Sequence, residues 1–174
     1  MVIWRQGLTH GLLIDTGVWV LAVESSVALN LANWAHYGGA YMSSITASEL
    51  LLGVERASSA QRRALRAAFV ENLLSNIPML EFSLPVARTH ARMIAALPKS
   101  VTATAHDALI AATAVHHGFG LLTRNVADFK IFAGLKLEAF GASTLKMYRV
   151  KHVPLAPTPS PPTCSNFAHF ARWL

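Results

Sequence analysis

Short apolar runs that alternate with longer helical stretches are the feature of this sequence that most limits its fold. The segments between the runs show helical spacing, as where Leu65, Phe69, Leu73 and Ile77 recur every fourth residue. Alternating strands and helices predict a central, mainly parallel sheet of about five strands with helices on both faces. The expected fold is therefore a three-layer α/β/α sandwich, with strands at residues 11–15, 40–43, 79–82, 119–123 and 135–138.

Helix-starting and helix-stopping residues divide the segments between these runs. Ser44 or Thr46 is expected to cap one helix and Thr102 or Thr104 another, because short hydroxyl side chains accept the free amide hydrogens of a first turn. Gly118 is expected to end the latter helix. The predicted helices cover residues 16–37 with a break near Ser25, 44–56, 58–77, 83–97 and 102–117, with a turn or short helix at 125–129.

The chain length and the charge distribution predict one folded domain followed by a basic tail. A length of 174 residues with 53% hydrophobic residues suits a single core. Residues 141–174 hold four of the 15 basic residues, none of the nine acids and a cluster of prolines. We therefore expect an N-terminal extension at residues 1–10, a domain at 11–140 and a basic, proline-rich tail at 141–174.

The cysteine count and the hydropathy pattern restrict the cellular compartment. Cys164 is the single cysteine, which excludes a disulfide within the chain and fits a reducing cytoplasm. No apolar run of the length needed for a membrane span occurs, so a membrane partner is not expected. A net charge of +6 is compatible with nucleic acid or an acidic partner and proves neither.

The few acidic residues fall in positions that suggest one site. All three aspartates of the chain, Asp15, Asp107 and Asp128, lie next to the carboxyl end of a predicted strand or in a first helical turn. Glu49 lies one turn into the helix that follows the second strand, with Glu55 as its rival. Ligands of parallel sheets bind beyond the carboxyl ends of the strands, so we expect these acids to converge.

A cluster of carboxylates is typical of divalent-metal chemistry. Carboxylates that meet raise one another's pKa unless a cation lies among them, and Mg²⁺ prefers oxygen ligands. Such ions activate water for the displacement of a phosphoryl group, so the cluster predicts phosphodiester hydrolysis without a nucleophilic side chain. The alternative reading is that each aspartate only caps a helix or forms a turn.

Around these acids the sequence resembles the PIN-domain family and, within it, the VapC-type toxins of bacterial toxin–antitoxin pairs. The resemblance covers roughly residues 11–140, and its motifs occur in the family's order. The matching segments are Leu13-Ile14-Asp15-Thr16, Ser44-Ile45-Thr46-Ala47-Ser48-Glu49-Leu50, His106-Asp107-Ala108-Leu109-Ile110-Ala111-Ala112 and Leu122-Thr123-Arg124-Asn125-Val126-Ala127-Asp128-Phe129.

This resemblance implies a specific activity and specific partners. The implied activity is Mg²⁺- or Mn²⁺-dependent cleavage of RNA by a homodimer that a cognate antitoxin inhibits, with operator DNA bound only through the antitoxin complex. Asp15, Glu49, Asp107 and Asp128 become the catalytic, metal-binding acids. Thr16, Thr123 and Asn125 become supporting polar residues.

Two departures from the family pattern weaken this assignment. Gly17 stands where the family often has Asn or Ser, which removes a hydrogen bond beside Asp15. The segment at residues 97–102, before Asp107, is altered. They favour an alternative, a catalytically weak or inactive PIN-fold protein that acts with an antitoxin in DNA binding and autoregulation.

Several basic residues are candidate contacts for RNA. Arg62, Arg63 and Arg66 form a cluster at the start of one predicted helix, and Arg124 lies beside the proposed site. Neutralising phosphates drives RNA binding, but a solvated helix face explains the cluster equally well. His106 is more readily explained as a capping or surface residue than as a general acid.

Overall fold

A five-stranded parallel sheet forms the centre of the protein in this computed structural model, which describes residues 11–25 and 29–141. The strand order is β3-β2-β1-β4-β5, so β1 lies in the middle. Every neighbouring pair is parallel. All carboxyl ends of the strands therefore lie along one edge. The strands are β1 (Leu12–Ile14), β2 (Ala40–Ser43), β3 (Met79–Leu80), β4 (Gly120–Thr123) and β5 (Lys136–Ala139).

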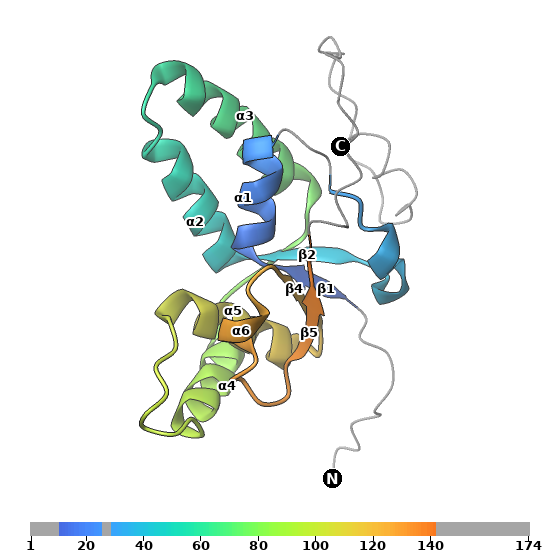
Figure 1. Ribbon diagram of the computed structural model, residues 1–174, viewed down its shortest axis with the longest axis vertical. Helices are drawn as coiled ribbons and strands as arrows, with labels where there is room; N and C mark the ends of the chain where they lie inside the picture. Colours follow the sequence, from blue (N-terminus) through green and yellow to red (C-terminus); the bar gives the residue numbers. More distant parts are fainter. Residues whose placement is uncertain (1–10, 26–28, 142–174) are drawn as a thin grey trace.

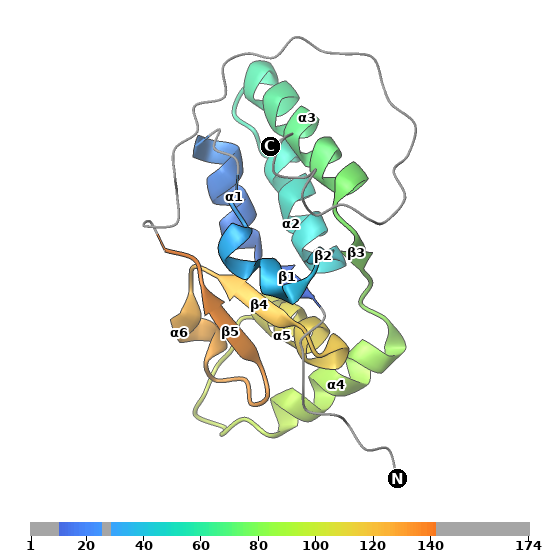
Figure 2. The ribbon, with the colours of Figure 1, turned by 90° about the vertical axis from the view of Figure 1, so that its right-hand side faces the viewer.

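Helices cover both faces of the sheet. Helices α1, α2 and α3 lie on one side of the strands and α4, α5 and α6 on the other, while α2 and α3 form a hairpin that projects from the body (Figures 1 and 2). The helices are α1 (Thr16–Ser25), the 3-10 helix η1 (Ala32–Tyr37), α2 (Ser44–Glu55), α3 (Ala60–Asn76), α4 (Leu84–Ala95), α5 (Ala105–His117) and α6 (Val126–Phe129).

The side chains of the central strands alternate between two hydrophobic clusters. Leu12 and Ile14 pack with residues of α1, α2 and α3, whereas Leu13 packs with residues of α5 and with Phe129. All three side chains are at most 2% exposed. This burial on both faces explains why β1 is a continuous apolar run, and it confirms the predicted three-layer α/β/α sandwich.

The structure corrects several predicted boundaries. The expected helix at 16–37 is α1, which ends at Ser25, and a separate 3-10 helix at 32–37. The strand expected at 79–82 contains only Met79 and Leu80. The predicted extension at 1–10 and, apart from Gly141, the predicted tail at 141–174 lie outside the described residues.

The cap of α2 is Ser43 rather than Ser44 or Thr46. Its hydroxyl accepts a hydrogen bond from the Thr46 amide at 2.9 Å, and its backbone remains extended. The chain passes directly from β2 into α2, so the last residue of the strand takes the capping position. Thr104 caps α5 as expected, and Gly118 ends that helix in the left-handed conformation with a φ of 70°.

One partly buried carboxylate joins η1 to the edge strand β5. Glu138 accepts hydrogen bonds from Trp34 Nε1 at 3.2 Å and from the Tyr37 hydroxyl at 2.6 Å. The Trp34 ring also stacks on Phe140, with centroids 5.8 Å apart. These contacts hold η1 against β5 and Phe140. Among residues 11–25 and 29–141, no helix is long and apolar enough to cross a membrane.

A substitution at Gly120 in β4 tests how closely η1 packs on the sheet. A Cβ atom at Gly120 would lie 2.6 Å from the Tyr37 ring, whereas one at Gly53 in α2 would meet nothing within 4 Å. We expect Gly120→Ala to lower the free energy of unfolding by about 1–3 kcal/mol. The control Gly53→Ala should raise it by up to about 1 kcal/mol, because alanine favours helices. Urea denaturation measures both, and equal effects would contradict this packing.

Candidate active site

Asp15 lies at the centre of the carboxyl edge of the sheet, directly after β1. Its backbone amide continues the sheet by donating to the Leu122 carbonyl of β4 at 2.9 Å. Asp15 is buried, with only 7% of its surface exposed. Helix α1 begins at the next residue, and the Thr16 amide donates to the Asp15 carboxylate. The middle strand therefore places a buried acid at a helix N-terminus.

Thr123 holds this carboxylate from the neighbouring strand. Its hydroxyl, which is fully buried at the end of β4, donates to Asp15 Oδ2 at 2.8 Å. The Thr123 hydroxyl oxygen in turn accepts a hydrogen bond from the Asn125 backbone amide at 3.0 Å. Asp15 is thus linked through one hydroxyl to the loop that carries Asn125 and Asp128.

Glu49 approaches from α2. It lies one and a half turns into a helix that starts at the end of β2, which directs it toward the same edge of the sheet. The Thr16 hydroxyl donates to Glu49 Oε2 at 2.5 Å, and His106 Nδ1 lies 2.7 Å from Glu49 Oε1. Its rival Glu55 instead pairs with Arg63 on the surface, at 3.2 Å.

Asp107 enters from the first turn of α5. Its amide donates to the Thr104 hydroxyl at 3.2 Å, so the cap sets the direction in which this turn leaves the preceding loop. That loop contains the altered segment 97–102, in which the Val101 amide donates to the Pro98 carbonyl at 2.9 Å. The departure from the family pattern therefore leaves the start of α5 regularly capped.

The pKa of Asp15 depends on its burial and on the residues around it. Burial is the largest effect and raises the pKa of Asp15, while the Thr123 hydroxyl and the Thr16 amide lower it. The negative charges of Asp107 and Glu49 raise the pKa of Asp15 further. Three carboxylates from distant parts of the sequence are therefore close enough to repel one another.

Asp128 is placed differently from these three acids. It lies in α6 on the surface, and it accepts a hydrogen bond from the Asn125 side chain. In residues 11–25 and 29–141, no three His, Cys, Asp or Glu side chains meet in an arrangement that could hold a metal ion. Asp15, Asp107 and Glu49 are thus neighbours, but they do not form a closed set of ligands.

Two of the candidate RNA-binding arginines of α3 contact the end of α2. Arg63 Nη2 donates to the Glu55 carbonyl at 2.8 Å, and Arg66 Nη1 donates to the Gly53 carbonyl at 2.9 Å. Helix ends leave carbonyls without helical partners, so these arginines stabilise the α2–α3 hairpin. Arg62 donates to the Ser58 hydroxyl at 3.0 Å, and Arg124 is exposed beside Thr123.

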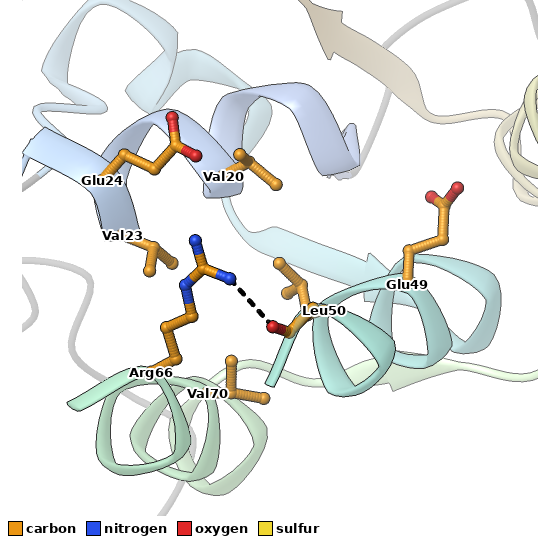
Figure 3. A pocket seen from close by; sticks show the side chains of 8 residues that line it. Val20, Val23, Glu24, Glu49, Leu50, Arg66 and Val70 are labelled. Atoms are coloured by element: carbon orange, nitrogen blue, oxygen red, sulfur yellow. Dashed lines mark hydrogen bonds between the residues drawn. The ribbon is translucent and has the colours of Figure 1, made fainter. Parts of the chain in front are cut away.

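An open groove between α1, α2 and α3 leads to the site. Figure 3 shows Glu49 at one end of it, away from Arg66, whose guanidinium points between α1 and α2. The groove has an apolar floor with acids at its margins, and its lining residues are Val20, Val23, Glu24, Glu49, Leu50, Gly53, Arg66 and Val70. A partner segment in this groove would therefore lie beside Glu49.

Comparison with known proteins identifies the family of this fold. The PIN domain family matches residues 12–135 of the chain. The chain belongs to the PIN-domain family. A protein from Rickettsia felis named Ribonuclease VapC1 is 43% identical to this PIN domain over 128 residues, which cover 73% of this chain and 94% of that protein. The predicted VapC-type resemblance is therefore confirmed.

Solved structures agree with the fold of this PIN domain. A structure of VapBC2 from Rickettsia felis bound to a DNA fragment from their promoter matches with a TM-score of 0.64 and 21% identity, covering 75% of this chain and 99% of that one. A member of the VapBC family of toxin–antitoxin systems from Mycobacterium tuberculosis matches with a TM-score of 0.58 and 23% identity. It covers 75% of this chain and 97% of that chain.

Gly17 leaves space beside the buried acid of this PIN domain. A Cβ atom at Gly17 would lie 3.4 Å from Asp15 Oδ2, an ordinary contact, and the backbone there is not in the left-handed region. A serine or asparagine would therefore fit next to the carboxylate. Without one, the side-chain hydrogen bond from Thr123 keeps Asp15 in place.

The contact between His106 and Glu49 was not expected from the sequence. The residues are 57 positions apart, and His106 was interpreted as a capping or surface residue. Its position directly before Asp107 was the available signal, because a first-turn residue next to a site acid also faces the carboxyl edge of the sheet.

Asp15→Asn tests the cost of burying this acid. The folded state raises the pKa of Asp15 above its unfolded value, so the folded protein binds the proton more tightly and loses stability as the pH rises through the folded-state pKa. Asparagine removes that charge and can still accept the Thr123 hydrogen bond. We expect a higher free energy of unfolding than wild type at pH 7, in a chelating buffer.

The difference in the free energy of unfolding between Asp15→Asn and the wild type should shrink as the pH falls through the folded-state pKa of Asp15. Below that pH the wild-type carboxyl is itself neutral. Denaturant titrations at several pH values measure this dependence. Asp128→Asn serves as the control, because Asp128 is exposed and should give no comparable gain at pH 7. A less stable Asp15→Asn protein at neutral pH would contradict the interpretation.

Proposed function

We propose that this protein is a metal-dependent endoribonuclease that acts as the toxin of a toxin–antitoxin pair. The observation that carries the proposal is the approach of Asp107 and Glu49 to Asp15 at the carboxyl edge of a PIN-domain sheet, where burial and then these two charges raise the pKa of Asp15. The relative from Rickettsia felis that bears the name Ribonuclease VapC1 supports RNA as the substrate.

Asp15, Asp107 and Glu49 are the residues we propose to hold Mg²⁺ or Mn²⁺, with Asp128 joining from α6. Carboxylate oxygens are the hard ligands that these ions prefer. When bound, the ion supplies an activated water and charge stabilisation for phosphodiester hydrolysis. Because the acids of the described residues do not form a closed set of ligands, water molecules would complete the coordination of the ion.

The supporting residues have separate roles in this proposal. The Thr123 hydroxyl holds one Asp15 oxygen in place, which leaves the second oxygen for the ion. Asn125 orders the loop of Asp128 through its side chain. The Thr16 hydroxyl restrains Glu49. The arrangement therefore orients the acids before any ion binds, which lowers the cost of assembling the site.

An antitoxin is the partner that we propose. The similar structures are a VapBC2 bound to promoter DNA and a member of the VapBC toxin–antitoxin family, which supports an antitoxin and operator DNA bound through the complex. The groove between α1, α2 and α3 offers apolar surface beside Glu49 for such a partner. The homodimer and the cytoplasmic location remain predictions of the sequence.

The alternative is a PIN-fold binding protein with little or no cleavage activity. Gly17 beside Asp15 and the open arrangement of the acids are the observations that favour it. The two proposals differ in whether function depends on a metal ion and on the charge of Asp15. A binding module needs neither.

RNA cleavage with and without Mn²⁺ or Mg²⁺ separates the two functions. We expect cleavage only with the ion, and a loss on the order of 10²-fold or more in Asp15→Asn and Asp107→Asn, because each removes charge that the ion requires. Glu49→Gln should also lose activity. Glu55→Gln, a matched change on the same helix, should not, because Glu55 pairs with Arg63 on the surface.

Folded variants are required for this comparison, and circular dichroism checks them. Absence of cleavage by the wild type with any ion, together with normal antitoxin binding by all variants, would establish the binding module. Cleavage that persists in Asp15→Asn would remove the proposed site altogether.

Arg124 is the basic residue that we propose to contact RNA nearest the site. It is exposed and follows Thr123, whose hydroxyl binds Asp15. We expect Arg124→Ala to weaken RNA binding and to reduce the slope of log K against log salt by about one phosphate contact. Arg88→Ala, on the exposed surface of α4, is the control. Equal salt slopes for the two variants and the wild type would argue against this contact.

A further inference from the structure

Both carboxylate oxygens of Glu49 are held by side chains that adjoin the other two acids. Thr16, which follows Asp15, donates to Oε2 at 2.5 Å, and His106, which precedes Asp107, binds Oε1 through Nδ1 at 2.7 Å. Thr16 is the first residue of α1, and His106 lies beside Asp107 in the first turn of α5. Glu49 is therefore held between the residue that follows Asp15 and the residue that precedes Asp107.

We propose that His106 is a positioning residue which, together with Thr16, holds the Glu49 carboxylate in the orientation needed to bind a divalent cation with Asp15 and Asp107. The inference rests on the proposed metal-dependent function. A glutamate side chain has three rotatable bonds, and Glu49 stands at the margin of an open groove, so its carboxylate needs restraint to stay at the site.

A similar arrangement occurs at two of the other acids, which supports a role in the site. Asp15 is held by the Thr123 hydroxyl, and Asp128 by the side-chain amide of Asn125. Partners of this kind around a metal site orient the ligands, and their loss typically weakens metal affinity 10- to 100-fold. Glu49 follows this pattern with two donors in place of one.

A purely structural link between α2 and α5 explains the contact less well. The His106 side chain is 57% exposed and that of Glu49 is 26% exposed, and pairs in such surroundings contribute little to stability. His106 needs only an Nδ1–H donor for the proposed role. The proposed role requires an N–H donor at this position and does not require a charge on His106, whereas a surface ion pair requires the charge.

The experiment compares His106→Ala with His106→Asn in the full chain. The asparagine amide nitrogen occupies about the same place as Nδ1 and preserves a donor, whereas alanine removes it. Titration calorimetry with MnCl₂ alone measures metal binding without requiring activity. We expect alanine to weaken Mn²⁺ binding about 10- to 100-fold and asparagine to restore most of it.

His116→Ala provides the matched control, because His116 lies at the other end of α5 and contacts Thr89. It should bind Mn²⁺ like the wild type. Thermal unfolding in EDTA should give similar midpoints for all the variants. Thr16→Val and Thr16→Ser repeat the test from the other side of Glu49, and the serine, which keeps the hydroxyl, should again restore binding.

The outcomes separate the failure of this inference from that of the proposed function. A wild-type protein that binds no Mn²⁺ removes the metal site itself. Wild-type affinity in His106→Ala overturns the positioning role, and so does an equal loss of thermal stability in both His106 variants with unchanged Mn²⁺ binding. Normal Mn²⁺ binding with cleavage lost in both variants would instead make His106 a proton donor, and would also overturn the proposal.

Discussion

The hydrogen bond from Thr123 to Asp15 joins the two central strands at the edge where the site is built. Both residues are buried at the carboxyl ends of adjacent parallel strands, and the donor and acceptor are 2.8 Å apart. The Asn125 amide binds the same hydroxyl, so the loop after β4 takes its starting position from this contact. The orientation of Asp15 and the approach of the Asp128 loop both depend on it.

Around this contact the protein brings like charges together, which opposes folding. Burial and the nearby charges of Asp107 and Glu49 raise the pKa of Asp15. The sandwich tolerates this cost because its two hydrophobic clusters hold α1, α2 and α5 against the strands independently of the acids. Stability and the proposed chemistry are therefore in opposition at this edge, as is usual for a site that concentrates charge.

The periodicity of the sequence was sufficient to predict the layers and all five strands, although β3 is shorter than expected. Buried runs such as Leu12–Ile14 and Gly120–Thr123 are mostly apolar because both faces of a parallel sheet are covered. The break between α1 and η1 was predicted only as an irregularity near Ser25. A 3-10 helix was not foreseen at 32–37, because its position depends on Trp34 and Tyr37 reaching Glu138, about a hundred residues away in sequence.

The sequence by itself singled out the residues that we propose for the chemistry, because acids are scarce in this chain and its three aspartates follow a strand or open a helix. Only the tertiary structure decided which of them meet. It brings Asp107 and Glu49 to Asp15, leaves Asp128 with Asn125, and places His106 on Glu49. The physical reason is that strand order and helix direction set these distances, and neither is encoded in local spacing.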